Sequence, residues 1–329
     1  MSEHLPSVTI IIAARPGQAE IKAVQAARQL DYPAGQLEII VARGKQPSVQ
    51  RNTAIKSAQG EWIYFLDDDS VPPPQNLHCA AKHFSNPAVK MIGGPNLCPP
   101  DAPALEKVFA VVLASWLAFG PSRARYASFG RSRESNEKEL ILCNLLARRA
   151  DLLELGGFNE ALYPNEENAL MDELQKRGGK LIYDPQLIDL RRPRHSLPAF
   201  IKMLGTYGRG RAEQFRVTPT FGSALNFVPP LFCIYLLSLA IFQLAAWGKP
   251  CGLLKIASVV PLAFYLPAVL LQTVASISAH GFARSLMAMP LLVASHIFYG
   301  FGFWHGLFTK LRRGPQRARF EVVLETVAR

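Results

Sequence analysis

The sequence has few charged residues, and three long stretches have none at all. Charged residues make up 19% of the 329 positions, against about 25% in an ordinary soluble protein. Asp, Glu, Lys and Arg are all absent from Val217–Gly248, Ile256–Ala279 and Ser285–Thr309. Each stretch is longer than the roughly 20 residues that a helix needs to cross a bilayer. We therefore expect a polar part over residues 1–215 and a membrane part over residues 216–329.

Cysteine is also scarce, and its spacing favours free thiols over a disulfide framework or a structural zinc site. The five cysteines form no C-x-x-C pair and no Cys/His ligand pattern, which is typical of free thiols in a reducing compartment. The first residues, Met1–Pro6, include a Glu and a Pro, and the apolar run after them covers only about seven residues, too short for a secretory signal. The sequence therefore predicts that the polar part stays in the cytoplasm, attached to the inner membrane.

The chain carries a net charge of +11, and its basic residues flank the apolar stretches. They are Arg209, Arg211 and Arg216 before the first stretch, and Lys310, Arg312, Arg313, Arg317 and Arg319 after the last. Such flanking cations usually mark the cytoplasmic side and attract anionic lipids. Nucleic-acid binding is the competing interpretation of the charge, but no recognised nucleic-acid module accompanies it. We predict membrane lipids as partners, and no nucleic acid.

Strand and helix signals alternate through the first part. Short β-branched or apolar runs are followed by stretches with helical spacing, which favours a mostly parallel sheet with helices on both faces. The predicted strands are Ser7–Ala13, Leu37–Ala42, Trp62–Leu66 and Val89–Gly93, and the predicted helices are Gln18–Leu30, Ser48–Ala58 and Gln75–Phe84.

Three consecutive aspartates, Asp67–Asp69, follow the third predicted strand. In a parallel sheet, ligands bind beyond the carboxyl ends of the strands, which is where these residues fall. Clustered carboxylates repel one another unless a positive group lies between them, and Mg²⁺ usually takes one or two carboxylates together with substrate phosphates. A solvated turn explains the same residues, because Asp and Ser before Pro are common turn formers. Both interpretations stay open on spacing alone.

Several segments together resemble the family 2 glycosyltransferases, whose catalytic domain has a Rossmann-like fold called GT-A. The similarity runs in the right order along nearly the whole chain. The segments are SVTIIIAARP, PSVQRNTAIKSAQGEWIYFLDDDS, GGFNEALYPNEENALMDELQKRGGKLIYDP, YGRGR and HIFYGFGFWHG. The resemblance implies a GT-A domain followed by transmembrane helices in a non-processive member, since no Q-x-x-R-W follows the acidic loop.

The resemblance also implies roles for individual residues. Asp67 and Asp69 match the D-x-D motif that binds Mg²⁺ or Mn²⁺ on the donor diphosphate. Glu167 matches the general base, and Glu166 is a second candidate because the register of N-E-E-N can slip by one. The expected donor-binding residues are Ala13, Arg15, Arg51, Asn52 and Asp68.

Two departures from the family pattern affect the donor side. Many members carry an acidic residue after the second strand that contacts the nucleobase, whereas this chain has Ala42–Gly44 there. A histidine often completes the metal shell after the acidic helix, and this chain reads DLRRPRHSL in that region. His195 is a candidate for that metal ligand but is out of register, and Arg192 or Arg194 is the alternative, neutralising phosphate instead. Arg209 and Arg211 of YGRGR are expected either to contact phosphate or acceptor or to anchor the domain at the membrane.

The implied reaction is inverting transfer of a sugar from a nucleotide-diphosphate donor to a lipid-linked or glycan acceptor, in lipid-linked or cell-envelope glycan synthesis. A polyprenyl-phosphate sugar synthase is an alternative within the class. A non-catalytic membrane-anchored scaffold and a metal-dependent phosphohydrolase are alternatives outside it.

Two further expectations concern the arginine-rich segment Phe119–Glu139 and the membrane part. The first is expected to be either a lid or a solvated loop. Membrane helices are expected near Phe221–Trp247, Leu253–Ala279 and Leu286–Phe308. Three full crossings would place the basic tail outside, against the positive-inside tendency. One of the three segments is therefore expected to be interfacial or re-entrant, unless the tail is an exception.

Overall fold

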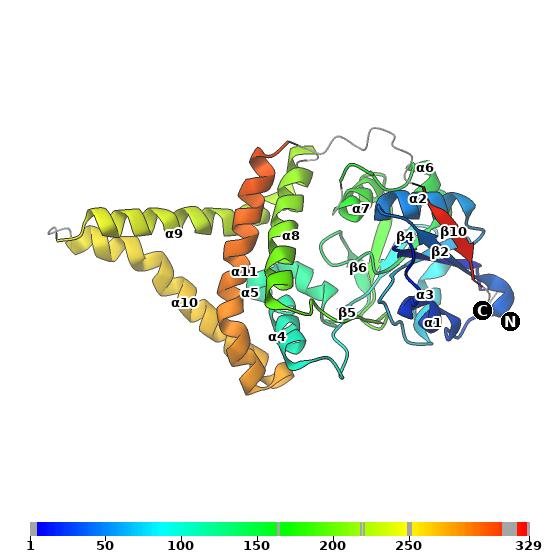
Figure 1. Cartoon of the computed structure of the whole chain (residues 1–329), viewed down its shortest axis with the longest axis horizontal. Coiled ribbons are helices and arrows are strands. Elements are labelled where there is room, and N and C mark those ends of the chain that lie inside the picture. Colours follow the sequence, from blue (N-terminus) through cyan, green and yellow to red (C-terminus); the bar gives the residue numbers. More distant parts are fainter. Residues whose placement is uncertain are drawn as a thin grey trace. The chain divides into compact units, whose positions relative to one another are not determined.

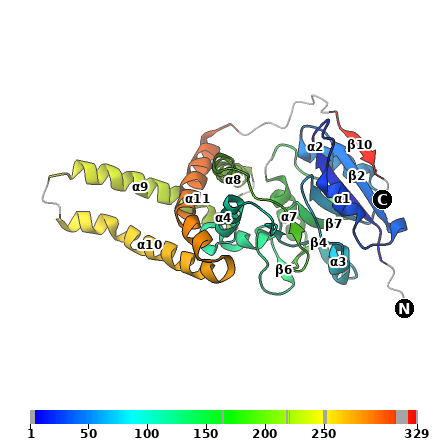
Figure 2. The ribbon, with the colours of Figure 1, turned by 60° about the horizontal axis from the view of Figure 1, so that its bottom comes forward.

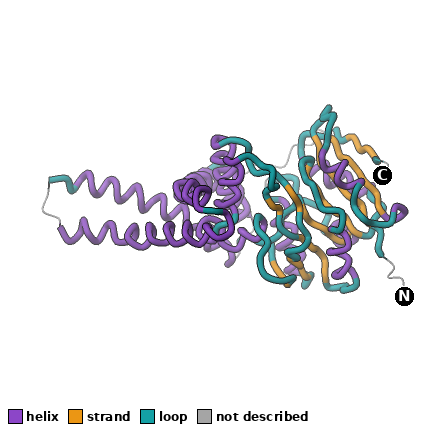
Figure 3. The backbone as a smooth tube through the Cα atoms, turned by 90° about the horizontal axis from the view of Figure 1, so that it is seen from below, coloured by secondary structure: helices purple, strands orange, loops and turns teal. Residues whose placement is uncertain are grey.

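The computed structural model describes residues 5–162, 165–217, 219, 221–248, 252–310 and 321–327. These residues form two compact units. The first comprises Met1–Asp101, Pro121–Arg192 and Arg312–Arg329, and the second comprises Ala102–Gly120 and Pro193–Leu311. Strands occur only in the first unit among the described residues, whereas the second is helical (Figure 3).

A mixed sheet of eight strands forms the centre of the first unit. In order across the sheet the strands are β10 (Val323–Thr326), β2 (Leu37–Arg43), β1 (Val8–Ala14), β3 (Trp62–Asp67), β7 (Asn144–Arg148), β4 (Val89–Gly93), β8 (Lys180–Tyr183) and β6 (Arg133–Ser135). Strands β1, β2 and β3 are parallel, as are β4 and β8, whereas β10, β7 and β6 run against their neighbours. This confirms the predicted α/β fold with a mostly parallel sheet.

Apolar side chains on both faces of the central strands explain why helices cover both faces. On one face Ile10 and Ile12 belong to a cluster with residues of α1 (Lys22–Arg28) and α3 (Asn76–Phe84). On the other, Ile11 belongs to a cluster with residues of three helices. Those helices are α2 (Pro47–Ser57), α6 (Arg149–Glu154) and α7 (Glu166–Lys176). A short 3₁₀ turn, η1 (Ala34–Gln36), leads into β2, and β5 (Asn96–Leu97) pairs with β9 (Asp189–Leu190).

The strand that closes one edge of this sheet comes from the far end of the sequence. Strand β10 pairs antiparallel with β2, with Leu324 opposite Ala42 and Glu325 opposite Val41 (Figure 2). Leu324 packs on the apolar cluster that contains Ala42. The division expected at residue 215 therefore differs from the contact units, because residues 321–327 join the sheet and Ala102–Gly120 joins the helical unit.

The segment Phe119–Glu139, expected to be a lid or a solvated loop, contains the 3₁₀ helix η2 (Gly120–Arg125) and the edge strand β6. Three of its arginines, Arg123, Arg125 and Arg133, make contacts within the first unit. Arg125 donates to the carbonyl oxygens of Glu137 and Lys138, and the Arg133 guanidinium stacks 4.5 Å from the centre of the Tyr183 ring. Residues 121–139 are therefore an ordered part of the sheet unit, whereas Phe119 and Gly120 belong to the helical unit.

The second unit is built from helices. They are α4 (Ala104–Leu113), α5 (Trp116–Phe119), α8 (Leu197–Val217), the 3₁₀ helix η3 (Phe221–Phe227), α9 (Val228–Ala245), α10 (Gly252–His280) and α11 (Phe282–Phe308). Helices α8 and α11 lie side by side (Figure 1). Glycines allow this close approach: a Cβ atom built on Gly302 would lie 2.0 Å from the Gly205 carbonyl oxygen.

Three helices are long and apolar enough to cross a membrane, which confirms the predicted membrane segments. They are Ala224–Ala245, Gly252–His280 and Phe282–Phe308. Pro229 and Pro230 lie in the first turn of α9, where a missing N–H is tolerated, whereas Pro261, Pro267 and Pro290 lie inside helices that continue past them. A bent pair, Ala104–Leu113 with Trp116–Arg125, also passes the length and composition test, with a bend of 60°.

Candidate active site

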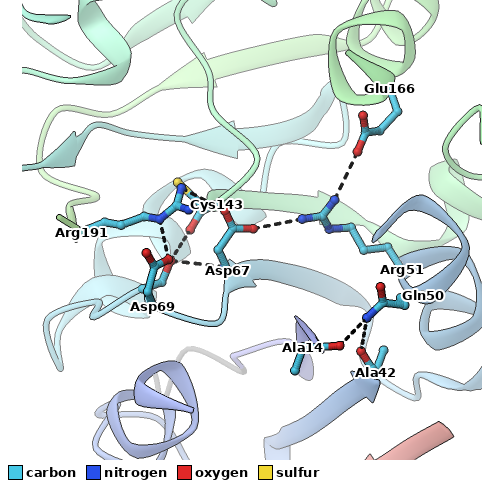
Figure 4. Close-up of polar contacts among 10 residues, drawn as sticks. Ala14, Ala42, Gln50, Arg51, Asp67, Asp69, Cys143, Glu166 and Arg191 are labelled. Carbon is cyan, nitrogen blue, oxygen red and sulfur yellow. Dashed lines mark hydrogen bonds and ion pairs between the residues drawn. The ribbon is translucent and has the colours of Figure 1, made fainter. Parts of the chain in front are cut away.

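The three aspartates begin where β3 ends, at the carboxyl edge of the parallel strands. Asp67 is the last residue of β3 and lies opposite Ala13 of β1. A turn follows, in which the backbone N–H of Ser70 donates to the Asp67 carbonyl oxygen at 3.1 Å. The Asp68 carbonyl oxygen accepts from the N–H of Ala23, at the start of α1. The turn places the carboxylates of Asp67 and Asp69 on one side, next to two arginines (Figure 4).

Two guanidinium groups neutralise these carboxylates. Arg191 donates from Nη1 to Asp67 Oδ2 at 2.9 Å and from Nε to Asp69 Oδ1 at 2.5 Å. Arg51 of α2 binds the other oxygen of Asp67, with Nη2 3.0 Å from Oδ1. Burial lowers the pKa of Arg191, but the nearby carboxylates outweigh it and raise the pKa well above its ordinary value. Arg191 is thus a permanent cation that joins both acidic residues.

Arg51 links the aspartates to the acidic helix α7. Its Nη1 lies 3.3 Å from Glu166 Oε1, and Glu166 Oε2 accepts from the Asn165 N–H at 3.0 Å. Glu166 is 2% exposed. Burial, and to a lesser degree the neighbouring Glu167, raise the pKa of Glu166 to about 7 against the opposing effect of Arg51. Glu166 therefore acts as a buried anchor for Arg51.

Glu167 differs from its neighbour because its side chain is only half-buried. Both residues lie in the first turn of α7, where the helix dipole favours negative charge. Asn168 Nδ2 lies 3.4 Å from Glu167 Oε1, and Asn168 Oδ1 accepts from Arg125 at 2.7 Å. This arrangement holds the N-terminus of α7 while leaving Glu167 accessible.

The turn after β1 is held by side chains from β2, α2 and β10. Gln50 Nε2 donates to the carbonyl oxygens of Ala14 (2.8 Å) and Ala42 (2.6 Å) and so joins the ends of β1 and β2. Arg43 Nη1 donates to the Gln18 carbonyl oxygen at 2.7 Å, and Arg43 Nε pairs with Glu325 of β10 at 2.7 Å. The region where the family places a nucleobase-contacting acid thus holds an Arg–Glu pair completed by the C-terminal strand.

Two residues expected on the donor side, Asn52 and Arg15, take different places. Asn52 is 8% exposed and binds both backbone groups of Phe158, donating to the carbonyl oxygen at 2.9 Å and accepting from the N–H at 2.8 Å. It packs on Gly157, whose φ of 82° requires glycine. Asn52 therefore positions the glycine turn before α7. Arg15 is exposed in the loop after β1.

Of the five cations predicted to contact phosphate or acceptor, three precede α8 in the chain and two lie on it. Arg192, Arg194 and His195 are exposed in the segment that leads to α8. On α8, Arg209 pairs with Glu213 and Arg211 donates to Gln214.

Sequence reasoning missed Arg191, the neighbour of a predicted residue, and also Asp189. The basic pair after LIYDPQLIDL was the only available signal for Arg191. Asp189 is fully buried, accepts from the Val71 N–H at 2.8 Å, and has a pKa raised by burial to about 7. It therefore fixes the turn that follows the aspartates.

A divalent cation fits this site only when a bound phosphate compound supplies further coordinating oxygens. Among the described residues, no three His, Cys, Asp or Glu side chains gather closely enough to hold a metal ion. One guanidinium nevertheless reaches both Asp67 and Asp69, so the two carboxylates lie within reach of a single cation. Two carboxylates plus phosphate oxygens is a usual donor set for Mg²⁺.

Comparisons with known proteins agree with a GT-A-like fold. Residues 22–127 match the model of the glycosyl transferase family 2. The chain therefore resembles this family over that part of its length.

Two similar proteins illustrate the relationship. The pre-mycofactocin glycosyltransferase of Mycobacterium tuberculosis is 23% identical over 179 residues, which cover 51% of this chain and 34% of that protein. The match therefore spans about a third of that relative's length. The mannosyltransferase PcManGT from Pyrobaculum calidifontis, solved in complex with GDP-Man and Mn²⁺, has the same fold with a TM-score of 0.56 and 18% identity over 88% of each chain.

Proposed function

We propose that this protein transfers a sugar from a nucleotide-diphosphate donor to a hydroxyl or phosphate acceptor, with inversion, in lipid-linked or cell-envelope glycan synthesis. One observation carries the proposal. In a chain that resembles family 2, two aspartates at the carboxyl edge of the sheet share a charge network with Arg51, Arg191 and Glu166. Such a network suits a diphosphate leaving group, which develops negative charge as the sugar departs.

Arg51 and Arg191 are the groups proposed to contact the donor diphosphate. Both are guanidinium groups, which bind phosphate oxygens through paired N–H donors. Arg51 Nε is buried without a hydrogen-bond partner among the described residues, so the side chain keeps an unused donor beside Asp67. Asp67 and Asp69 are the proposed ligands of Mg²⁺ or Mn²⁺. Such an ion, when bound, supplies additional positive charge to the diphosphate.

Glu167 is the proposed general base. A base must reach the proton that it removes, and Glu167 is accessible, whereas both oxygens of Glu166 are already engaged. In a single displacement the acceptor oxygen bonds to the anomeric carbon while the bond from that carbon to the diphosphate breaks. Glu167 takes the acceptor proton, and the nucleoside diphosphate leaves with the bonding electron pair. One base suffices for this inverting reaction.

The apolar helices of the same chain support a lipid-linked acceptor. Three of them are long and apolar enough to cross a membrane, and a chain anchored in this way works next to lipid substrates. A polyprenyl phosphate, which yields a polyprenyl-phosphate sugar, and an existing lipid-linked glycan share this chemistry. They differ in whether the attacking oxygen belongs to a phosphate or to a sugar hydroxyl.

The donor is tested by a thermal-shift screen of nucleotide sugars against the purified protein, with and without Mn²⁺. A donor present at 100 times its Kd stabilises the folded state by about 2.7 kcal/mol. We expect one nucleotide sugar to raise the melting temperature in the presence of Mn²⁺, and Asp69→Ala to abolish the rise. Asp101→Ala, at an exposed turn, is the matched control. A screen without any stabilising nucleotide sugar would contradict the proposal.

The reaction is tested with radiolabelled donor and either polyprenyl phosphate or a lipid-linked sugar. Labelled lipid together with nucleoside diphosphate supports transfer, whereas free phosphate indicates a phosphohydrolase. Glu167→Gln should lower the rate by roughly 10²–10⁴-fold, the typical contribution of a positioned base, with donor binding retained. A non-catalytic scaffold gives no product with either acceptor.

A further inference from the structure

Along the sequence, strands of the sheet unit come both before and after each group of apolar helices. This order restricts how those helices can be placed in a membrane. Strands β1 to β5 precede α4, strands β6 to β9 lie between α5 and α8, and β10 follows α11. All strands of the eight-stranded sheet are hydrogen-bonded into one layer. A sheet with open edges does not span a bilayer, because its backbone groups would be unsatisfied in hydrocarbon. The whole sheet therefore lies on one side.

The first apolar excursion must return to the side from which it starts. It leaves the sheet unit after Asp101 and re-enters it at Pro121. Helices α4 and α5 are separated by a break at Ala114–Ser115, where the Ser115 hydroxyl accepts from the Ala118 N–H at 3.1 Å and caps α5. The bent pair is consequently not a full crossing, although its length and composition would allow one.

The same reasoning applies to the three long helices. The chain leaves the sheet unit after Arg192 and returns in β10. Between these points it must cross the membrane an even number of times. Three crossings by α9, α10 and α11 are therefore incompatible with the observed pairing of β10 and β2.

Helix α11 is the one that fits hydrocarbon least. In its most apolar stretch of 18 residues, 33% is buried inside the protein. The corresponding share is 11% for Ala224–Ala245 and 6% for α10. Its neighbour α8 runs in the same direction along it, with Gly205 against Gly302 and Ala212 against Gly306. Helix α8 carries charged residues at 202, 209, 211, 213 and 216. Immersing α11 in hydrocarbon would draw these charges in with it, which is costly.

Polar contacts at the ends of this pair also indicate an aqueous boundary. Arg216 of α8 donates to the carbonyl oxygens of Gly306 (3.0 Å) and Thr309 (2.5 Å), at the C-terminus of α11. A cation at this end satisfies open carbonyl groups and complements the helix dipole. The exposed apolar residues Phe282, Leu286 and Phe301 give α11 a face suited to acyl chains. The pair thus has the character of an interfacial element.

Helices α9 and α10 have the opposite character. Helix α9 contacts α11 in its first turns, where Trp304 donates to the Pro230 carbonyl oxygen at 3.0 Å, and then leaves it (Figure 1). Beyond this contact many of its apolar side chains are exposed, with Leu237 at 63% and Leu244 at 72%. Trp247, 83% exposed, lies where the hairpin turns, and Trp is enriched at membrane–water boundaries.

We propose that the α9–α10 hairpin crosses the bilayer out and back, while α11 with α8, and the bent pair α4–α5, lie at the interface on the side of the sheet. The cations of α8 then face the anionic headgroups of that leaflet. The C-terminal segment lies on the same side as the sheet, so its basic residues obey the positive-inside tendency.

Single cysteines, introduced after replacing the five native cysteines by Ser, test this arrangement in sealed membrane vesicles with an impermeant maleimide. The reporters are Ser57→Cys on the sheet unit, Trp247→Cys at the hairpin tip, Ser278→Cys before α11 and Thr326→Cys in β10. We expect Ser57→Cys, Ser278→Cys and Thr326→Cys to react from one side and Trp247→Cys from the other. The proposal would be overturned if Thr326→Cys or Ser278→Cys reacted from the same side of the membrane as Trp247→Cys. Reaction of all four reporters from one side would overturn it as well.

Two further measurements keep the test decisive if the cysteine-free variant does not fold. Epitope tags at the two ends of the otherwise native chain should be removed together, or protected together, when protease is added to sealed vesicles. A disulfide between Ala42→Cys and Leu324→Cys should form on mild oxidation if β10 pairs with β2 in the membrane-bound protein. Tags with opposite protection, or reporters that never cross-link, would contradict the even number of crossings.

Discussion

Single residues decide how the acidic cluster is stabilised. The sequence predicts the position of Asp67 and Asp69, because apolar residues of a buried strand lead straight into them. It does not predict which cation compensates them, since Arg191 lies 122 residues further along the chain than Asp69. Proximity between such distant residues depends on the packing of the whole sheet. A metal ion bound by these carboxylates would therefore share them with a resident guanidinium.

Replacing Arg191 with Gln tests this competition. Without the guanidinium the two carboxylates keep their charges but lose the cation that joins them, so Mn²⁺ no longer has to displace it. We expect Mn²⁺ alone, without any nucleotide, to bind about tenfold more tightly to the variant, equivalent to about 1.4 kcal/mol. Isothermal titration calorimetry measures this directly. Arg177→Gln, an exposed arginine outside the site, is the control, and equal affinities in both variants would contradict the prediction.

The buried carboxyl of Glu166 predicts a pH dependence of stability. Its pKa is raised in the folded protein to about 7 from 4.5, so folding favours the protonated form. Its contribution to stability is fully present below about pH 4.5 and is lost as the pH rises through 7, by at most about 1.4 kcal/mol per pH unit. The melting temperature of the wild type relative to Glu166→Gln should therefore fall between pH 5 and pH 8. A constant difference over this range would show that Glu166 does not titrate there.

At the scale of elements, the α8–α11 contact depends on particular glycines. A Cβ atom built on Gly208 would lie 2.0 Å from the Tyr299 carbonyl oxygen, whereas one on Gly205 would have no neighbour closer than 3.7 Å. Gly208→Ala should therefore lower the free energy of unfolding by about 1–3 kcal/mol, the usual cost of overpacking. Gly205→Ala, three residues away on the same helix, should be tolerated. Thermal unfolding in detergent compares the two, and equal melting temperatures would argue against the close contact.

Strand β10 gives a second pair of matched variants. Leu324 packs on the apolar cluster of the sheet, whereas Val323 is 51% exposed. Leu324→Asp buries a charge and should destabilise the sheet unit by about 1–3 kcal/mol, and Val323→Asp should have little effect. Limited proteolysis at the C-terminus reports the loosening of the strand. Similar protection of both variants would contradict the observed packing.

Local sequence patterns predict elements well where neighbouring residues determine them. The first three strands, their helices and the membrane segments lie within a few residues of the predicted bounds, because long apolar runs and turn residues mark them. Strand β10 escaped prediction because Val323–Thr326 is four residues long and follows a basic segment. Only its pairing with β2 gives it order, and pairing over such a separation leaves no local pattern.

At the scale of the whole molecule, the membrane arrangement predicts where a charge is tolerated. Leu271 of α10 and Phe301 of α11 are both exposed apolar residues, at 70% and 60%. Leu271→Lys places a charge in a crossing helix and should cost about 2.5–3.5 kcal/mol of insertion free energy. Phe301→Lys lies at the interface, where a lysine reaches water, and should insert normally. The fraction of each variant recovered in alkali-washed membranes measures the difference, and equal recovery would contradict the assignment of α11.

The division into a sheet unit and a helical unit illustrates what a linear pattern omits. A single boundary at residue 215 follows from the change in composition along the chain. Contacts instead place Ala102–Gly120 with the long helices and the last strand with the sheet. In the helical unit the Leu117 N–H donates to Gln272 at 3.2 Å and the Leu117 carbonyl oxygen lies 2.9 Å from His296 Nε2. Composition alone does not reveal such partners.

The position of β10 has a consequence for biosynthesis. A ribosome releases the chain from its N-terminus onward, so β2 emerges early and its partner emerges after all three long helices. Throughout that interval the outer edge of β2 carries unpaired backbone groups, a state prone to aggregation. The sheet thus reaches its final form only after α9, α10 and α11 have been synthesised. With the α9–α10 hairpin crossing the bilayer as proposed, this order of events would couple completion of the sheet to membrane insertion.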